Sequence, residues 1–222
     1  MDLKSQLTTL MRYYDGRAPE YEELYYRNDP VRLGEFDRAA DVMARKLRDR
    51  NVLEIACGTG YWTERLVKCA RSVMATDVSA DMLSFARKKN ISGKVVKFRC
   101  ADAYDLAPVE GQFDAGVANF WLSHVPRSML DEFLRGFHRR LGSGAVVFMI
   151  DNYRVPGYGG EFIRVAGSED TFRRRQIADG SSHVIIKNYY DEAQLQDIFS
   201  PHTDVLEVNS GQYYWWLTYQ VT

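Results

Sequence analysis

Short apolar runs of strand length alternate with segments of helical periodicity through the first two thirds of the chain. The runs cover residues 52–56, 72–76, 95–98, 113–119 and 145–150, and each is of a length typical of a buried strand. Apolar positions at helical spacing predict helices over the intervening and flanking segments, 32–48, 61–70, 79–89 and 127–141. Strands that alternate with helices through short connections form a parallel sheet covered on both faces. The pattern therefore predicts an α/β fold with a Rossmann-like sheet.

The pattern changes after residue 151. Residues 153–167 are rich in glycine and predict a loop or a short cap, and 171–177 and 183–189 flank a turn typical of a hairpin. A helix over 191–199 and strands over 204–209 and 213–221 complete the chain. The last two strands would add an antiparallel edge hairpin, which makes a seven-stranded, mostly parallel sheet.

Composition narrows the class of function. The 222 residues suffice for one domain, 1–222, and a net charge of −1 provides no long-range attraction for nucleic acid. No apolar run is long enough to span a membrane, and the first residues lack the layout of a signal peptide. The three cysteines, Cys57, Cys69 and Cys100, have no metal-ligand spacing. We expect a cytoplasmic protein without a bound metal, either a monomer or a homodimer.

The first strand ends in a glycine loop, Cys57-Gly58-Thr59-Gly60, and a helix is predicted to follow it. Glycines here let the backbone approach a ligand, and the start of the helix directs free N–H groups toward it. Asp77 ends the second predicted strand, seventeen positions after Gly60, near the offset expected of a ribose-binding carboxylate. A helix cap or a turn is the structural alternative for Asp77.

The choice of cofactor depends on two positions. A dinucleotide fingerprint has a third glycine where this chain has Thr63. Glu54 lies within the strand itself, and a carboxylate there would repel the phosphates of NAD. The same carboxylate would be favourable beside the ammonium and sulfonium of S-adenosylmethionine (SAM). The residues favour SAM, with an NAD-dependent oxidoreductase as the alternative.

Four segments in order, 52–60, 76–83, 100–103 and 113–119, resemble the four motifs of class I SAM-dependent methyltransferases. The resemblance implies contacts to the methionine part of SAM. Gly58 and Gly60 would line it, Glu54 would order its amino group through water, and Asn119 would lie under its backbone.

The same resemblance implies contacts to the adenosine part. Asp77 would bind the ribose hydroxyls, and Val78 and Met82 would enclose the adenine. Asp102 would accept a hydrogen bond from the exocyclic amine, and Ala103 would offer a backbone N–H.

Residues 13–21 resemble the lid of small-molecule members of the family, including the ubiquinone/menaquinone-biosynthesis type. In that interpretation residues 1–31 form an N-terminal lid, and Tyr14 and Tyr21 close over the carboxylate of the cofactor. The alternative is a helix that packs its aromatic residues on the sheet. Residues 153–190, where members of this fold differ, would form the variable substrate cap.

The loop after the fourth strand, 119–126, lies where a methyl acceptor is expected. His124 is the general-base candidate because its unperturbed pKa is near neutrality, with positioning of the cofactor or a structural hydrogen bond as the alternatives. Phe120 and Trp121 could form a wall of the acceptor pocket, with a place in the core as the alternative for one of them. Arg173-Arg174-Arg175 could bind an anionic group of the acceptor, although a solvated face is the favoured interpretation. Alternation along a strand would point at least one of the three the other way.

Together these features predict a SAM-dependent methyltransferase that acts on an O, N or C nucleophile of a small metabolite, with aromatic metabolites among the candidates. Such transfer is an in-line displacement, so alignment and exclusion of water matter most. A methyltransferase for protein or RNA and a non-catalytic SAM-binding protein remain alternatives. Methylation of DNA amino groups is disfavoured, because residues 119–122 lack the Pro-Pro-aromatic segment of those enzymes.

Overall fold

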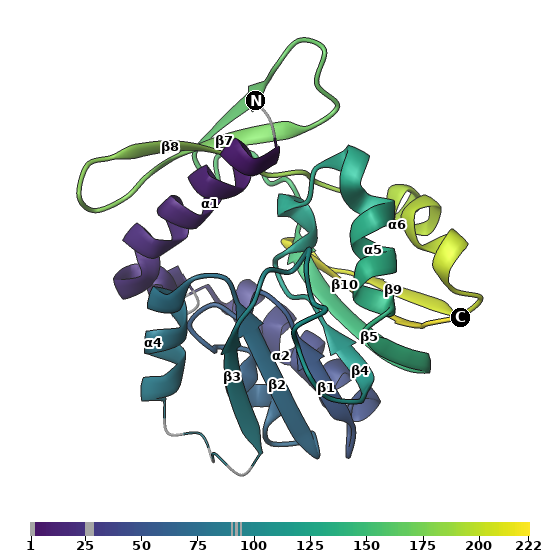
Figure 1. Cartoon of the computed structure of the whole chain (residues 1–222). Helices are drawn as coiled ribbons and strands as arrows, with labels where there is room; N and C mark the ends of the chain where they lie inside the picture. Colours follow the sequence, from purple (N-terminus) through teal and green to yellow (C-terminus); the bar gives the residue numbers. More distant parts are fainter. Residues whose placement is uncertain (1–2, 25–28, 90, 92, 94) are drawn as a thin grey trace.

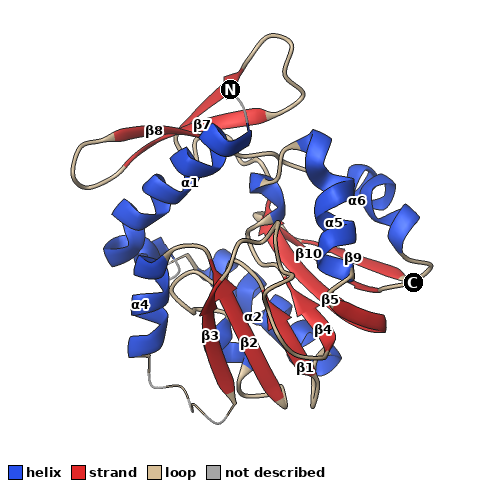
Figure 2. Ribbon diagram, in the orientation of Figure 1, coloured by secondary structure: helices blue, strands red, loops and turns tan. Residues whose placement is uncertain are grey.

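A seven-stranded sheet with helices on both faces forms the body of the molecule (Figures 1 and 2). The computed structural model describes residues 3–24, 29–89, 91, 93 and 95–222. Residues 1–2 and 25–28 of the expected lid lie outside the described residues.

The strands of the main sheet lie in the order β3-β2-β1-β4-β5-β10-β9. The first five are parallel, and β10 and β9 add an antiparallel hairpin along the edge of β5. The predicted fold is therefore confirmed. The strands are β1 (Asn51–Glu54), β2 (Ser72–Asp77), β3 (Val96–Cys100), β4 (Phe113–Val117), β5 (Leu141–Asn152), β9 (Leu206–Ser210) and β10 (Tyr214–Gln220).

Two apolar layers hold the helices to the sheet, because successive strand residues point to opposite faces. On β1, Val52 packs in the layer with α2, α3 and α4, whereas Leu53 packs in the layer with α5 and α6. The helices are α1 (Leu3–Arg17), α2 (Pro30–Lys46), α3 (Thr63–Leu66), α4 (Ala80–Lys88), α5 (Leu130–His138) and α6 (Glu192–Phe199). Short 3₁₀ helices are η1 (Ala18–Leu24), η2 (Leu122–His124), η3 (Arg127–Met129) and η4 (Ser200–His202).

Some boundaries differ from those predicted. The helix α3 spans only Thr63–Leu66 of the predicted 61–70, and α5 ends at His138. The strand β5 starts at Leu141, because Leu141 already pairs with Phe113 before a bulge in the β4–β5 ladder. The amphipathic pattern continues across this helix-to-strand junction, so periodicity alone could not locate it.

A second sheet, with the order β6-β7-β8, is formed by the region after β5. The hairpin of β7 (Thr171–Gln176) and β8 (Ser182–Ile186) was predicted, and β6 (Glu161–Arg164) was not. The prediction of a loop over 153–167 was wrong at β6, a short strand among glycines that forms by pairing with β7. This small sheet packs on α1, where Leu10 and Tyr13 contact Ile177 and Ile185. Figure 1 shows α1 between the small sheet and the main sheet.

A buried carboxylate on α2 ties this helix to the β9–β10 turn. Glu35 is 1% exposed and accepts backbone N–H groups from Gln212, Tyr213 (3.0 Å) and Tyr214 (3.1 Å). A Cβ at Gly211 would lie 2.4 Å from the Glu35 side chain, so only glycine lets the turn approach it.

We predict that Glu35→Ala lowers the free energy of unfolding by about 2–4 kcal/mol, because three backbone N–H groups, two of them buried, lose their acceptor. Urea denaturation would measure the change. Glu132→Ala, at an exposed glutamate on α5, is the matched control and should change stability by less than about 0.5 kcal/mol. Equal effects of the two substitutions would contradict the role of Glu35.

Candidate cofactor and acceptor site

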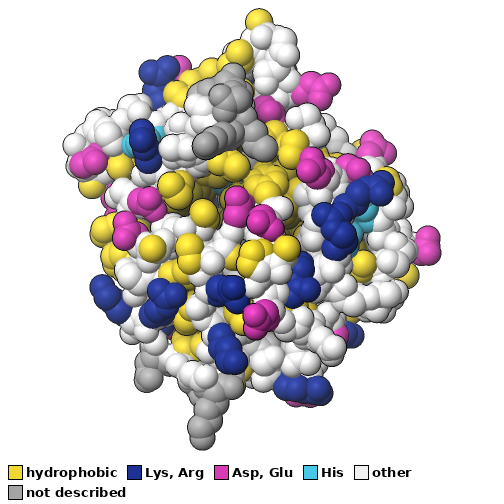
Figure 3. Space-filling view, viewed as in Figure 1, with side chains coloured by type: hydrophobic (Ala, Val, Ile, Leu, Met, Phe, Trp, Pro, Cys, Tyr) yellow, Lys and Arg dark blue, Asp and Glu magenta, His cyan; other side chains and the backbone are white. Residues whose placement is uncertain are grey.

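The strand order reverses between β1 and β4, because the chain runs outward through β2 and β3 before it returns to β4. Open α/β sheets bind ligands at the carboxyl ends of the strands at such a point. The loops that follow β1, β2, β3 and β4 line one cavity of about 350 Å³, and α1 covers it with Leu7, Leu10 and Met11. We call this the first cavity. Figure 3 shows apolar side chains gathered around a hollow in this face, with acidic side chains at its edge.

The two glycines of the loop after β1 have different surroundings. Gly58 (φ 57°) lines the first cavity, whereas Gly60 (φ 81°) is not among its described lining residues. A Cβ at Gly60 would lie 3.2 Å from the Cβ of Ala86, so this glycine lets the loop pack on α4. The left-handed backbone at both positions also favours glycine.

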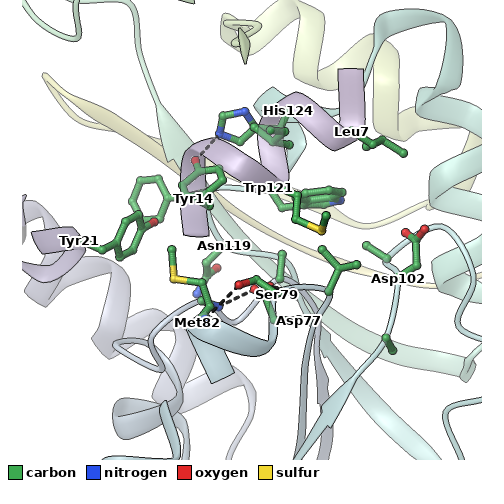
Figure 4. Close-up of a pocket in the computed structure, with 18 of the residues that line it drawn as sticks. Leu7, Tyr14, Tyr21, Asp77, Ser79, Met82, Asp102, Asn119, Trp121 and His124 are labelled. Carbon is green, nitrogen blue, oxygen red and sulfur yellow. Dashed lines mark hydrogen bonds between the residues drawn. The ribbon is translucent and has the colours of Figure 1, made fainter. Parts of the chain in front are cut away.

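The carboxylate of Asp77 joins the loops after β1 and β2 (Figure 4). Its Oδ2 accepts the Gly58 N–H at 2.8 Å, and its Oδ1 accepts the Ser79 N–H at 2.9 Å. Burial raises the pKa of Asp77, and the two N–H donors oppose that effect. Ser79, rather than Asp77, caps α4 through the Met82 N–H. Asp77 therefore orders the loop that contains Gly58, and its own side chain lines the cavity.

The remaining residues expected around adenosine surround one end of the first cavity. Val78 precedes α4 and Met82 lies in its first turn, whereas Asp102 and Ala103 follow β3. All four residues line the cavity. The Oδ1 of Asp102 accepts the Tyr104 N–H at 2.9 Å, which orients the carboxylate.

Asn119 lies in the loop just after β4 and lines the same cavity. The side chain is 8% exposed, and neither its Oδ1 nor its Nδ2 has a hydrogen-bond partner among the described residues. A buried primary amide without partners is costly, so the cavity offers a polar ligand both a donor and an acceptor here.

Glu54 lies behind the glycine loop and is not among the described residues that line the first cavity. It is 1% exposed, and its Oε2 accepts the Thr63 hydroxyl at 2.7 Å. Its Oε1 has no hydrogen-bond partner in the described part of the chain. Burial raises the pKa of Glu54 to about 8, so the apo protein holds a proton there at neutral pH.

The charges of the first cavity select among cofactors. Asp77 and Asp102 face it, and no lysine or arginine is found among the described residues that line it. A diphosphate needs cations or a free helix terminus, and two carboxylates repel it. A nucleoside that carries a positive charge fits this lining, and NAD does not.

A second cavity of about 310 Å³ adjoins the first. The two share Tyr14, Tyr21, Phe120 and His124 as lining residues, so these four side chains form the junction. Tyr14 comes from α1, and its ring lies edge-on to Tyr21 at 5.8 Å between centroids. Trp121 lines the first cavity alone and packs against Tyr104 and Phe133.

His124 is neutral and already fully hydrogen-bonded (Figure 4). Its Nδ1 lies 2.7 Å from the carbonyl oxygen of Ile186, which can only accept, so Nδ1 carries the proton. The Tyr14 hydroxyl then donates to Nε2 at 2.8 Å. Burial, with the charge of Lys187, lowers the pKa of His124 to about 3, and burial raises that of Tyr14 well above its ordinary value.

A buried ion pair lies behind the junction, and the sequence did not point to it. Lys187 Nζ donates to Asp151 at 3.0 Å and to Ser123 at 2.6 Å, and Asp151 accepts the Ser123 N–H. Asp151 lies next to the last residue of β5 and Lys187 follows β8, so the pair ties the small sheet to the main sheet. In the sequence, the only signal for this ion pair was that Asp151 and Lys187 each follow a run of apolar strand residues.

Comparison with known proteins agrees with this geometry. A family model described as a methyltransferase domain matches residues 52–144, from β1 into β5. The ubiquinone biosynthesis O-methyltransferase of Xanthomonas oryzae pv. oryzae is 27% identical over 83% of this chain and 72% of its own length. The demethylmenaquinone methyltransferase of Paenarthrobacter aurescens is 31% identical over 55% of this chain and 48% of its own.

Solved structures are similar over the whole chain. The complex of DhpI with S-adenosylhomocysteine (SAH) superposes with a TM-score of 0.80 at 25% identity, covering 99% of this chain and 98% of DhpI. A Burkholderia thailandensis 1,6-didemethyltoxoflavin-N1-methyltransferase shares the fold, with a TM-score of 0.67 at 15% identity, over 100% of this chain and 91% of its own.

The fold and the first cavity define a Rossmann-like domain for a nucleoside cofactor. With these relatives, the chain is a SAM-dependent methyltransferase, an enzyme whose cofactor is SAM. No helix within the described residues is both long and apolar enough to cross a membrane.

We predict that Glu54 makes stability depend on pH. Its folded pKa of about 8 lies above the ordinary 4.5, so the stabilisation is present below about 4.5 and is lost as pH rises through about 8. Glu54→Gln should remove this dependence, which is at most about 1.4 kcal/mol per pH unit. Urea denaturation from pH 5 to 8 would measure it.

The matched control is Glu110→Gln, at an exposed glutamate. This control should keep the wild-type slope of stability against pH. A Glu54→Gln slope identical to that of wild type would show that Glu54 is ionised throughout this range.

Proposed function

We propose that the enzyme transfers the methyl group of SAM to an O, N or C nucleophile of a small metabolite. The first cavity would hold SAM and the second cavity the acceptor. The observation that carries this proposal is the junction of Tyr14, Tyr21, Phe120 and His124, which both cavities share. Two adjoining cavities of about 350 and 310 Å³ suit two small molecules placed end to end.

The residues around the first cavity would divide between two parts of the cofactor. Asp77 would accept hydrogen bonds from the ribose, Val78 and Met82 would enclose the adenine, and Asp102 and Ala103 would bind its polar edge. At the other end, Gly58 and the unpartnered amide of Asn119 would face the methionine part. Glu54 and Gly60 would act from behind the loop, and the ammonium of a bound cofactor nearby would favour the ionised form of the Glu54 carboxyl.

When bound, SAM supplies a methyl group on a positively charged sulfur, an already activated leaving group. The protein then needs to align the acceptor and exclude water. Residues 1–31, which contain α1, would act as the lid, with Tyr14 and Tyr21 above the cofactor. Residues 153–190, which form the small sheet, would cover the acceptor.

We further propose that His124 acts as a positioning residue for Tyr14. Its Nε2 lone pair accepts the Tyr14 O–H, so His124 could act directly as a base only after Tyr14 moves away. A neutral imidazole with a pKa of about 3 is also a weak base. The hydrogen bond instead fixes the Tyr14 ring at the junction.

Small acceptors are also what the relatives' names describe. One relative acts in ubiquinone biosynthesis, and one structural neighbour was solved with 1,6-didemethyltoxoflavin bound. The test is methyl transfer from labelled SAM to a cell extract divided by a size filter. Label in the small-molecule fraction would support the proposal, and label confined to retained protein or RNA would overturn it.

We predict that Asp77→Ala weakens binding of SAH at least tenfold in calorimetry. The variant loses a charge-assisted hydrogen-bond pair and the order of the Gly58 loop. Asp81→Ala, at an exposed aspartate on α4, is the matched control and should bind normally. Wild-type affinity in Asp77→Ala would contradict the assignment.

We predict that His124→Ala and Tyr14→Phe each lower kcat on an acceptor identified in that screen, and that the double variant loses no more than the larger single loss. Residues that act through one hydrogen bond are non-additive. The His124→Ala variant should keep nearly normal affinity for SAH. If the fold loss of kcat in the double variant equals the product of the two single losses, His124 acts independently of Tyr14.

A further inference from the structure

The second cavity carries the opposite charge to the first. Its described lining contains five cationic side chains, Arg17, Arg32, Arg173, Arg175 and Lys187, and no aspartate or glutamate. These residues come from α1, α2, β7 and the segment after β8, so the fold collects them from four separate elements. Like charges gathered around one cavity repel one another, and an anion would relieve that repulsion.

Two of the five cations are neutralised by carboxylates. Lys187 pairs with the buried Asp151 at 3.0 Å, and Arg32 lies 3.4 Å from Asp29. The other three, Arg17, Arg173 and Arg175, form no ion pair with a carboxylate within the described residues. The cavity therefore has a surplus of positive charge.

Arg173 is 5% exposed, and its partners are neutral. Its Nε donates to the Tyr189 hydroxyl at 2.8 Å, and one terminal nitrogen donates to the Gly160 carbonyl at 2.6 Å. These contacts orient the guanidinium without neutralising it. A buried charge without a counter-ion is costly. An unpaired buried charge of this kind is typical of a site in which the ligand supplies the counter-ion.

Successive side chains of β7 point to opposite faces of the small sheet, so its three arginines do not all face the cavity. Arg173 and Arg175 line the cavity, whereas the exposed Arg174 pairs with Glu161 at 3.0 Å on the other face. The interpretation of this run as a solvated face was therefore wrong for Arg173, because the small sheet and its glycine loop cover it. That outcome also supplies a control, since Arg174 has the same chemistry on the same strand.

The loop before β6 leaves room for Arg175. A Cβ at Gly159 would lie 3.4 Å from a terminal nitrogen of Arg175, and one at Gly160 would lie 2.3 Å from the Arg174 carbonyl oxygen. The Nε of Arg175 is buried and has no hydrogen-bond partner among the described residues. Arg175 thus has unused donor capacity at the cavity.

We propose that the second cavity binds the methyl acceptor by an oxyanion, a carboxylate or a phosphate, held by Arg173 and Arg175 with Arg17. A planar guanidinium binds either oxyanion through paired N–H donors. This inference rests on the proposed function and adds the chemical class of its substrate. The nucleophile would then lie on the part of the acceptor that points toward Tyr14, Tyr21 and Phe120.

The test uses the full chain loaded with SAH, and calorimetry with three probes: inorganic phosphate, benzoate and the neutral benzamide. Phosphate, benzoate or both should bind more tightly than benzamide, and the stronger one identifies the oxyanion. Arg175→Gln should weaken that binding at least about tenfold, because charge-assisted hydrogen bonds are lost. Arg174→Gln should leave it unchanged.

Three outcomes would overturn the proposal: benzamide binding as tightly as the anions, no anion binding, or equal losses in the Arg174 and Arg175 variants. Arg173→Gln tests the role of the buried guanidinium. If the Arg173→Gln variant does not fold, Arg175→Gln still tests the proposal. SAH affinity is measured first on each sample. Failure to bind SAH would count against the proposed function, and normal SAH binding with no anion preference would count against this inference alone.

Discussion

The hydrogen bonds from the Gly58 and Ser79 N–H groups to the half-buried Asp77 carboxylate are the interaction on which the site depends. They join the loops after β1 and β2 at the switch point of the sheet. With this contact in place, the glycine loop packs on α4 and the first cavity opens between α4 and the end of β4. One side chain therefore shapes the cavity and presents a carboxylate to it.

Charge divides the site into two halves. Carboxylates and an unpartnered amide face the first cavity, and unneutralised arginines face the second. The neutral pair of Tyr14 and His124 lies between them. Because a positively charged methyl donor suits the acidic half, the basic half is left for an acceptor of the opposite charge. Such a division would orient both molecules before any reaction occurs.

Local pattern and spacing were enough to predict the α/β fold and the main-sheet strands. The resemblance to class I SAM-dependent methyltransferases supplied eleven expected cofactor residues, and nine of them line the first cavity. Glu54 and Gly60 lie behind the loop instead, because motif position does not reveal which way a side chain faces. The strand β6 was missed since it forms only by pairing with β7. The basic cavity was anticipated only as the disfavoured interpretation of Arg173-Arg174-Arg175, because Arg17 and Arg32 lie far from these residues in sequence and join them only in the folded chain.

The most direct test of the account is a crystal structure of the chain with SAH. The account predicts electron density in the first cavity, with the ribose at Asp77, the adenine between Val78 and Met82, and the sulfur directed toward Tyr14. The second cavity should adjoin the sulfur and contain no part of the cofactor. A first cavity without SAH at saturating concentration, or SAH bound among the arginines, would contradict the account.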